Sequence, residues 1–268
     1  MIGLLPPVLL VGCGRMGGAM LAAWLERGLS PSVLVDPAPR LPEGGDAVTV
    51  LAAADRVPAD FAPAAVVLAI KPQQAATVLP QFARFAGSAV FLSIMAGRTI
   101  AGMRAALGPK ASVVRAMPNT PASIRAGTSV ACAGPGVRAA QKELCATLLG
   151  AVGKVAWVAD ETLLDAVTAV SGSGPAYVFL LAELLERAGV EQGLPADLAR
   201  LLARRTISGA GALLDASPED AANLRAAVTS RGGTTERALA ILMEEDAWPD
   251  SVSRAIAAAT QRSRALAG

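Results

Sequence analysis

A glycine-rich segment near the amino terminus has the spacing of a loop that binds the phosphates of a dinucleotide. Its glycines stand at positions 12, 14 and 17, directly after the apolar run Val8–Val11 and at the start of a helical stretch, Met16–Arg27. In such a loop the first glycine permits a tight turn, the second lets the backbone approach the pyrophosphate, and the third lets the helix pack on the strand. The helix N-terminus adds backbone N–H groups and a positive dipole. The residues predicted to bind the cofactor here are Gly12, Cys13, Gly14, Arg15, Met16 and Gly17.

The alternative for this segment is a glycine-rich turn without a ligand, and the strand before it and the helix after it favour the dinucleotide site. An acidic partner for the ribose is expected about 20 residues further on, where Asp36 ends the run Val33–Val35. A carboxylate there accepts hydrogen bonds from the ribose of NAD and repels the 2′-phosphate of NADP, whereas Arg40 could pair with that phosphate. Asp36 could instead only open the turn at Pro37. The sequence leaves NADH and NADPH open.

Three further loops follow predicted strands at their carboxyl ends, where open α/β sheets bind ligands. They are Lys71–Gln73, Ser93–Gly97 and Met117–Pro121. Each alone could be an ordinary loop, but three loops at the same sheet edge favour a cofactor and substrate cleft. Two prolines restrict the third loop, so its polar side chains should be held in place. The candidate cofactor residues of these loops are Ile70, Lys71, Pro72, Ser93, Ala96, Gly97, Pro118 and Asn119.

Two more glycine-rich segments interrupt the second half of the chain, Ser171–Tyr177 and Thr229–Glu236. In the first, Ser173 is a candidate N-cap and Pro175 suits the first helical turn. The second combines hydroxyl groups, glycines with accessible N–H groups and a helix start, which together could bind a carboxylate. Helix capping alone is the alternative for both segments.

The chain contains no histidine. Ser-His-Asp and Cys-His nucleophile pairs, HExxH zinc sites and a histidine general base are therefore excluded. The three cysteines are odd in number and lack CxxC spacing, which argues against a zinc site or a disulfide framework and favours a reducing cytoplasm. No metal site is predicted, and the chemistry falls to other side chains or to a cofactor.

The composition excludes some partners. With 24 Lys and Arg against 22 Asp and Glu, and only 3% aromatic residues, the chain has neither a charge footprint for nucleic acid nor a stacking platform for bases. The mean hydropathy of +0.47 raises the question of a membrane span. The uncharged stretch at residues 166–182 contains the Ser-Gly-Ser-Gly-Pro segment, which we expect to break it, so no membrane partner is predicted.

Short β-branched runs alternate with alanine-rich helical stretches in the first half, a pattern typical of a doubly wound, mainly parallel sheet with helices on both faces. Predicted helices include Gln73–Phe82, Thr99–Ala106 and Val137–Leu149. The expected strands are Val8–Val11, Val33–Val35, Ala65–Ile70, Ala89–Ile94 and Ser112–Met117, with Thr128–Ala133 and Lys154–Val158 as possible additions. After Val158 apolar residues recur at helical spacing. The sequence therefore predicts a Rossmann domain at residues 1–159 and an all-α domain at residues 160–268.

The predicted helices of the second half are apolar around much of their circumference, as in Thr162–Val170, Tyr177–Leu185 and Ile207–Leu214. A helix of this kind needs cover on more than one side. The remaining residues of this half are too few to supply that cover, so a second chain should pack against it. We expect an obligate homodimer.

These segments, taken together, closely resemble those of pyrroline-5-carboxylate reductase, in order and over nearly the whole chain. The most specific of them is the last, and the first is shared with many dehydrogenases. The matching segments are Gly12-x-Gly14-x-x-Gly17, Ile70–Gln73, Ser93–Gly97, Met117–Pro121, Ser171–Tyr177 and Val228–Thr235.

The resemblance implies reduction of L-1-pyrroline-5-carboxylate to L-proline by NADPH or NADH. It also implies a helical dimerisation domain, a cleft between one subunit's Rossmann domain and the partner's helices, and dimers assembled into larger rings. Lys71, Asn119 and Ser93–Gly97 would line the nicotinamide side, with Pro118 on the ring, and Asn119 is a candidate substrate contact as well. The substrate's carboxylate and ring nitrogen would be held by Ser230, Gly232, Gly233, Thr234 and Thr235.

The proposed chemistry needs no imidazole, because a protonated cyclic imine accepts hydride directly and the enzyme mainly orients it. Thr235 is the candidate donor or orienting group for the ring nitrogen. Three residues are unusual for the family: Arg231 stands in place of proline, Met95 in place of alanine, and Asp36 is atypical among relatives that favour NADPH.

Two other functions compete with the reductase. A β-hydroxyacid dehydrogenase uses a lysine in the first long helix of its second domain, and Asp160–Leu185 contains none. A non-catalytic NAD(P)-binding regulatory protein would keep the glycine loop but has no need of Ser230–Thr235.

Overall fold

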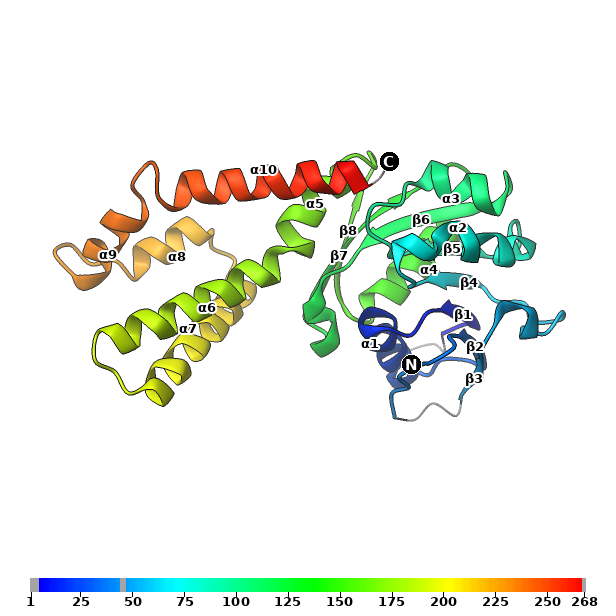
Figure 1. The fold of residues 1–268 in the computed structure, drawn as a ribbon, viewed down its shortest axis with the longest axis horizontal. Coiled ribbons are helices and arrows are strands. Elements are labelled where there is room, and N and C mark those ends of the chain that lie inside the picture. Colours follow the sequence, from blue (N-terminus) through cyan, green and yellow to red (C-terminus); the bar gives the residue numbers. More distant parts are fainter. Residues whose placement is uncertain (1–4, 44–46, 267–268) are drawn as a thin grey trace. The chain divides into compact units, whose positions relative to one another are not determined.

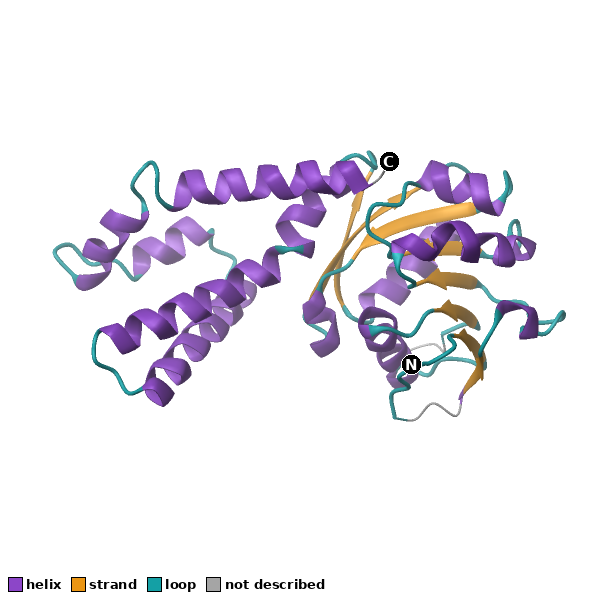
Figure 2. Cartoon of the chain, viewed as in Figure 1, coloured by secondary structure: helices purple, strands orange, loops and turns teal. Residues whose placement is uncertain are grey.

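The computed structural model describes residues 5–43 and 47–266. Their packing forms two compact units, one made of Met1–Gly172 with Ala259–Gly268 and the other of Ser173–Ala258. Strands occur in the first unit, and the second is helical (Figures 1 and 2). The domain ranges 1–159 and 160–268, predicted from where the strand pattern stops, remain a prediction.

One sheet organises the first unit. Its order is β3-β2-β1-β4-β5-β6-β7-β8, and every neighbouring pair is parallel except β6 and β7. The order reverses between β1 and β4, the switch point at which such sheets bind ligands. The doubly wound, mainly parallel fold is thereby confirmed. The strands are β1 (Val8–Val11), β2 (Ser32–Val35), β3 (Val48–Leu51), β4 (Ala65–Leu68), β5 (Val90–Ser93), β6 (Ser112–Met117), β7 (Gly127–Ala133) and β8 (Gly153–Val158).

Both faces of the central strands are buried, because alternate side chains enter two separate cores. In β4, Ala65 and Val67 belong to one core and Val66 and Leu68 to the other. Helices α1 (Arg15–Glu26) and α4 (Ala139–Gly150) supply residues to the first core. Helices α2 (Ala75–Val78) and α3 (Ile100–Leu107) supply residues to the second. This two-sided cover explains why the strands read as continuous apolar runs.

The strand prediction missed β3. Only its first residue, Val48, is buried, and as an edge strand it pairs with β2 alone, so it lacks the apolar run that marks the central strands. The omission matters for function, because β3 leads into Ala52–Ala54 at the ligand-binding edge of the sheet.

The helix predicted at Gln73–Phe82 is wrong in form. The chain instead makes a 3-10 turn at Pro72–Gln74, the short α2, and a second 3-10 stretch at Leu79–Phe85. Pro80 has no N–H to donate and crowds the preceding turn, so a regular α-helix cannot continue through it.

The interruption predicted at Ser171–Tyr177 is also wrong in form. Helix α5 (Leu163–Val167) passes into a π-helical turn at Thr168–Gly172 and then into α6 (Gly174–Glu191). Because the chain is already helical there, Ser173 has φ −87° and ψ −23°, and its side chain makes no capping hydrogen bond. Pro175 does lie in the first turn of α6. The expected break in the apolar stretch is therefore absent, and Leu163–Glu191 is long and apolar enough to pass a membrane-span test by length and composition.

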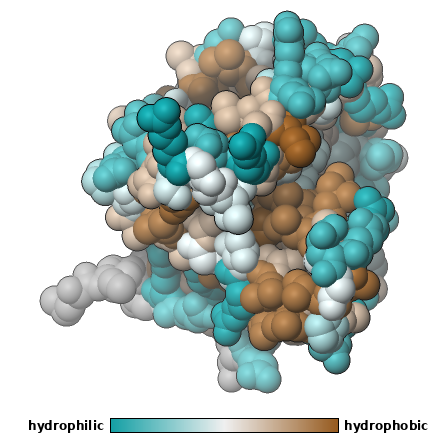
Figure 3. Space-filling model, turned by 90° about the vertical axis from the view of Figure 1, so that its left-hand side faces the viewer, coloured by the Kyte–Doolittle hydropathy of each residue, from teal (hydrophilic) through white to brown (hydrophobic). Residues whose placement is uncertain are grey.

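The second unit contains α6, α7 (Ala196–Ala216), α8 (Ala221–Ala227), α9 (Thr234–Leu242) and most of α10 (Trp248–Leu266). Helix α6 buries none of its residues within the single chain, and the Phe179 side chain is 66% exposed. Apolar side chains gather between polar ones on the surface seen in Figure 3. The exposed large apolar residues of α6 are Tyr177, Val178, Phe179, Leu180, Leu184, Leu185 and Val190.

Candidate active site

The glycine loop after β1 has the geometry that a pyrophosphate cradle needs. Gly12 has φ +92°, and a Cβ there would lie 2.7 Å from the carbonyl oxygen of Ala69. A Cβ on Gly17 would collide with the carbonyl oxygen of Gly12. By contrast, nothing lies within 4 Å of a Cβ position on Gly14. Two glycines are therefore needed by the fold itself, and the middle one leaves open space beside the N-terminus of α1 for a ligand.

Asp36 ties the end of β2 to this loop. Its Oδ2 atom accepts a hydrogen bond from the backbone N–H of Cys13 at 2.6 Å, and Oδ1 accepts one from the N–H of Ala38 at 2.8 Å. The second bond opens the turn at Pro37, so Asp36 makes the predicted turn contact. The first bond is an additional contact that holds the carboxylate against the dinucleotide loop.

Cys13 is buried beneath the loop. Its thiol donates to the carbonyl oxygen of Arg40 at 3.4 Å, which brings the backbone of Arg40 close while its side chain remains exposed. Burial, and then the charge of Asp36, raise the pKa of the Cys13 thiol above its ordinary value. The thiol therefore remains neutral near pH 7 and is not a nucleophile.

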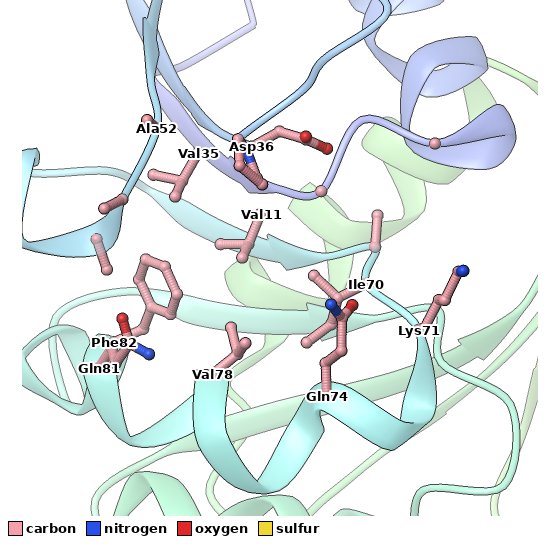
Figure 4. A pocket seen from close by; sticks show the side chains of 16 residues that line it. Val11, Val35, Asp36, Ala52, Ile70, Lys71, Gln74, Val78, Gln81 and Phe82 are labelled. Atoms are coloured by element: carbon pink, nitrogen blue, oxygen red, sulfur yellow. The ribbon is translucent and has the colours of Figure 1, made fainter.

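A cavity of about 410 Å³ lies at the switch point of the sheet. Figure 4 shows Val35, Ala52 and Phe82 on one side of it, and Ile70 and Lys71 on the other. Apart from Asp36 and Lys71 the lining is uncharged. The cavity is lined by Val11, Gly12, Gly14, Val35, Asp36, Pro37, Ala52, Ala53, Ala54, Ala69, Ile70, Lys71, Gln74, Val78, Gln81 and Phe82.

Some predicted cofactor residues meet at this cavity and others do not. The loop glycines 12 and 14, Asp36, Ile70 and Lys71 all line it. Sequence reasoning missed the small residues after β3 and the polar and aromatic residues near α2, because β3 and the broken helix were not foreseen. The predicted residues that do not line it are Cys13, Arg15, Met16, Gly17, Arg40, Pro72, Ser93, Ala96, Gly97, Pro118 and Asn119.

A buried hydrogen bond between two of its own residues stabilises the loop after β5. Ser93 is fully buried, and its hydroxyl oxygen accepts from the N–H of Met95 at 3.3 Å. Gly97 has φ +64°, and a Cβ there would lie 3.0 Å from the Cβ of Leu266 at the end of α10. Glycine at this position therefore permits both a left-handed turn and the close approach of the last helix.

The loop after β6 is joined to the π-helical turn. Asn119 accepts a hydrogen bond at Oδ1 from the N–H of Thr128 at 2.8 Å and donates one from Nδ2 to the hydroxyl of Ser171 at 3.2 Å. A Cβ on Gly172 would lie 2.6 Å from the terminal methyl group of Met117. The segments Met117–Pro121 and Ser171–Tyr177 are thus in direct contact. The Asn119 side chain is held by two hydrogen bonds, and a fixed side chain was predicted from the prolines of its loop.

The glycine-rich segment of the second unit makes a tight turn between α8 and α9. Gly232 has φ +74°, and the N–H of Gly233 donates to the carbonyl oxygen of Ser230 at 3.0 Å. Gly233 is the N-cap of α9, so Thr234 and Thr235 form its first turn. The backbone N–H groups of a first helical turn have no partner within the helix, so the segment can bind an anion.

Glu236 already occupies part of this turn. Its Oε2 atom accepts a hydrogen bond from the N–H of Gly232 at 2.8 Å. A glutamate in the third position of a helix that reaches back to the preceding backbone is a capping arrangement with a recognisable sequence signature. Sequence reasoning included Glu236 in the segment but assigned it no role.

Comparison with known proteins identifies the family. Residues 161–266 match the family model for pyrroline-5-carboxylate reductase dimerisation. A pyrroline-5-carboxylate reductase of Pseudomonas aeruginosa is 37% identical over 268 residues, which cover 98% of this chain and 97% of that protein. The chain belongs to the pyrroline-5-carboxylate reductase family. The resemblance noted in the sequence is confirmed.

Solved pyrroline-5-carboxylate reductases have the same fold. The structure from Coxiella burnetii is 30% identical, covers 98% of this chain and 99% of its own, and superposes with a TM-score of 0.89. The Plasmodium falciparum structure, solved with NADP bound, is 26% identical and has a TM-score of 0.84. The match covers 99% of this chain and 100% of the Plasmodium chain. The helical half of this reductase is accordingly a dimerisation domain, and the expected homodimer agrees with the match. Among the described residues, no group of three Cys, Asp or Glu side chains is placed to hold a metal ion.

Proposed function

We propose that this chain reduces L-1-pyrroline-5-carboxylate to L-proline with NADH or NADPH. The observation that carries the proposal is a cavity bounded by a dinucleotide glycine loop and Asp36 in a chain whose helical half matches the reductase dimerisation model. The cradle fits the cofactor, because the fold leaves open space at Gly14 beside the helix N-terminus where backbone N–H groups can meet phosphates.

The nicotinamide cofactor, when bound, supplies the hydride. The residues of the chain bind the imine, orient it and exclude water. In this proposal Lys71, Asn119 and Ser93–Gly97 line the nicotinamide side, with Pro118 on the ring. Asn119 is suited to a positioning task, since both ends of its amide are already hydrogen-bonded to the protein.

The substrate carboxylate is proposed to bind at Ser230–Thr235. Glu236 holds the N–H of Gly232, so the donors left for the carboxylate are the N–H groups at the start of α9 and the nearby hydroxyls. Thr235, in the first turn of α9, is proposed to orient the ring nitrogen through its hydroxyl. The charge of Glu236 disfavours a second carboxylate nearby, and the helix dipole offsets part of that cost.

A second copy of the chain is proposed to cover the apolar surface of the second unit. Besides the exposed face of α6, a groove of about 380 Å³ runs between α6 and α10 and includes Leu180, Leu184, Trp248 and Val252. Assembly of dimers into a ring is proposed from the resemblance to the family. Light scattering on the purified protein gives the number of subunits.

The apolar helix Leu163–Glu191 is proposed to serve this interface and not a membrane. Asp165 near its start is buried and accepts a hydrogen bond from Ser263 at 2.7 Å, and Glu186 near its end pairs with Arg200 at 3.0 Å. A cytoplasmic location is also proposed, because all three cysteines are free and buried, as expected in a reducing compartment.

Oxidation of NADH or NADPH, followed by absorbance in the presence of pyrroline-5-carboxylate, tests the proposed reaction. Turnover with either cofactor supports it. A folded protein that binds cofactor without turnover would instead be a regulatory protein. Turnover of a β-hydroxyacid but not the imine would indicate the dehydrogenase, which the absence of lysine from Asp160–Leu185 already disfavours.

A further inference from the structure

The structure offers a physical basis for the choice between the two nicotinamide cofactors. NADPH differs from NADH by one phosphate on the adenosine ribose, and the acidic residue at the end of the second strand is the group that meets this ribose. Here that residue is Asp36, which lines the cavity at the switch point. The choice therefore depends on what Asp36 can accept or repel, and on which cations stand beside it.

The Asp36 carboxylate is held in place before any ligand arrives. One oxygen bonds the N–H of Cys13 and the other the N–H of Ala38, at 2.6 and 2.8 Å. Each carboxylate oxygen can accept about two hydrogen bonds, so both retain acceptor capacity toward the cavity. A ribose with free 2′ and 3′ hydroxyls could donate hydrogen bonds to a carboxylate held in this way.

Among the described residues that line the cavity next to Asp36, none is a cation that would favour a phosphate. Beside it in the cavity are Val35, Pro37 and Ala52–Ala54, which are all uncharged. Lys71 is the other charged lining residue, and Figure 4 shows it at the right-hand edge of the pocket, with Asp36 at the top. Arg15 and Arg40 are exposed and do not line the cavity.

We propose that Asp36 makes this chain selective for NADH over NADPH. The proposal rests on the proposed function only in that the cavity must hold a nicotinamide dinucleotide. A phosphate carries close to two negative charges at neutral pH, and placing it beside a fixed carboxylate costs far more than placing a hydroxyl there. The relative from Plasmodium falciparum was solved with NADP bound, so the proposal gives this chain the other cofactor.

The competing explanation is that Asp36 only caps the glycine loop through Cys13. The two roles differ in what a neutral replacement does. Loss of a cap weakens both cofactors by the same factor, whereas loss of a selective charge weakens NADH and strengthens NADPH. The ratio of the NADPH and NADH dissociation constants therefore distinguishes the two roles of Asp36, whereas either constant alone does not.

The test is a binding titration of the full-length protein with NADH and with NADPH, without substrate, by calorimetry or by the change in NAD(P)H fluorescence. For the wild type we expect NADH to bind about 10- to 100-fold more tightly, the effect of one close pair of like charges at a partly exposed site. Asp36→Ser and Asp36→Asn should lower this ratio at least about 10-fold. Asp55→Asn, which removes an exposed carboxylate next to the lining residue Ala54, is the matched control and should leave the ratio unchanged.

Equal affinities in the wild type, or tighter binding of NADPH, would overturn the proposal even if the variants failed to fold. An unchanged ratio in a folded Asp36→Ser protein would also overturn it and leave Asp36 as a cap. If neither cofactor bound to the folded wild-type protein, the proposed function would fail together with the selectivity.

Discussion

The side-chain amide of Asn119 donates a hydrogen bond to the hydroxyl of Ser171, 52 residues further along the chain, at 3.2 Å. At its other end it accepts from the backbone of Thr128 at 2.8 Å. Asn119 therefore joins the loop after β6 to the π-helical turn and to the start of β7. π-helical turns are often found at functional sites, and this one contacts a loop that the proposed reaction uses.

Replacing Asn119 should lower both stability and activity. Asn119→Ala leaves the N–H of Thr128 without its acceptor, which costs about 1–3 kcal/mol and lowers Tm by roughly 2–4 °C for each kcal/mol in a protein of this size. Asn119→Asp keeps the acceptor and loses the donor to Ser171, so it should retain more stability. Thermal unfolding measures the stability of both variants, and NAD(P)H oxidation with the imine measures their activity. Ser123→Ala, which removes an exposed hydroxyl bonded to Thr120, is the control, and equal losses in all three variants would contradict this role.

Thr235→Ala should reduce kcat/KM for the imine by about 10²-fold or more if its hydroxyl orients or protonates the ring nitrogen. Cofactor dissociation constants, measured without substrate, should not change, because Thr235 is proposed to contact the imine and does not line the cofactor cavity. Steady-state kinetics and a cofactor titration check the two statements. Thr147→Ala, which removes an exposed helical hydroxyl in α4, should behave as wild type. Wild-type kinetics in Thr235→Ala would remove this residue from the mechanism.

Glu236→Ala should raise KM for the imine more than it lowers kcat. The substitution removes the acceptor for the N–H of Gly232 and an acidic residue from the first turn of α9, which together stabilise that helix start by about 1 kcal/mol. The turn should then be less well ordered for a substrate carboxylate. Glu236→Gln can keep the hydrogen bond and removes a charge that opposes the substrate carboxylate, so its KM should be no higher than that of the wild type. A KM that rises equally in both variants would contradict this role of the hydrogen bond.

The buried thiols should make the protein less stable at alkaline pH. Burial raises the pKa of Cys145 from 9.0 to about 12. The unfolded chain releases this proton near pH 9 and the folded chain retains it until about pH 12, so the free energy of unfolding falls as pH rises through that interval. Denaturant unfolding between pH 8 and about 11 should show a smaller decline in Cys145→Ala than in the wild type. Identical slopes would contradict the shifted pKa.

Much of the first unit could be predicted because its signals are local. The apolar runs of the central strands are buried on both faces, which makes them conspicuous in the sequence. Glycine is needed at positions 12 and 17 because a Cβ there would collide with backbone atoms, and any turn of this kind brings those atoms close. The loops at strand ends could be placed at one edge because parallel strands bring their carboxyl ends together.

Other parts could not be predicted, because they depend on residues far apart in the chain. β3 is an edge strand with one buried residue, so its residues and the alanines after it carry no strong pattern. The Ser-Gly-Ser-Gly-Pro segment was expected to interrupt the helix, yet a π-helical turn at Thr168–Gly172, packed against Met117, continues the helical backbone toward α6. The hydrogen bond that Asp36 accepts from Cys13 joins residues 23 positions apart and cannot be inferred from spacing.

By itself, then, the amino-acid sequence determined the fold class, the family and the type of cofactor, since these depend on periodicity, glycine spacing and short local segments. Tertiary structure decided which candidate residues face the cavity, how Asn119 is held, and that the Asp36 carboxylate meets the N–H of Cys13. The physical reason is that a hydrogen bond or close contact of this kind requires atoms to meet within about 3 Å. Only the packing of distant segments brings them that close.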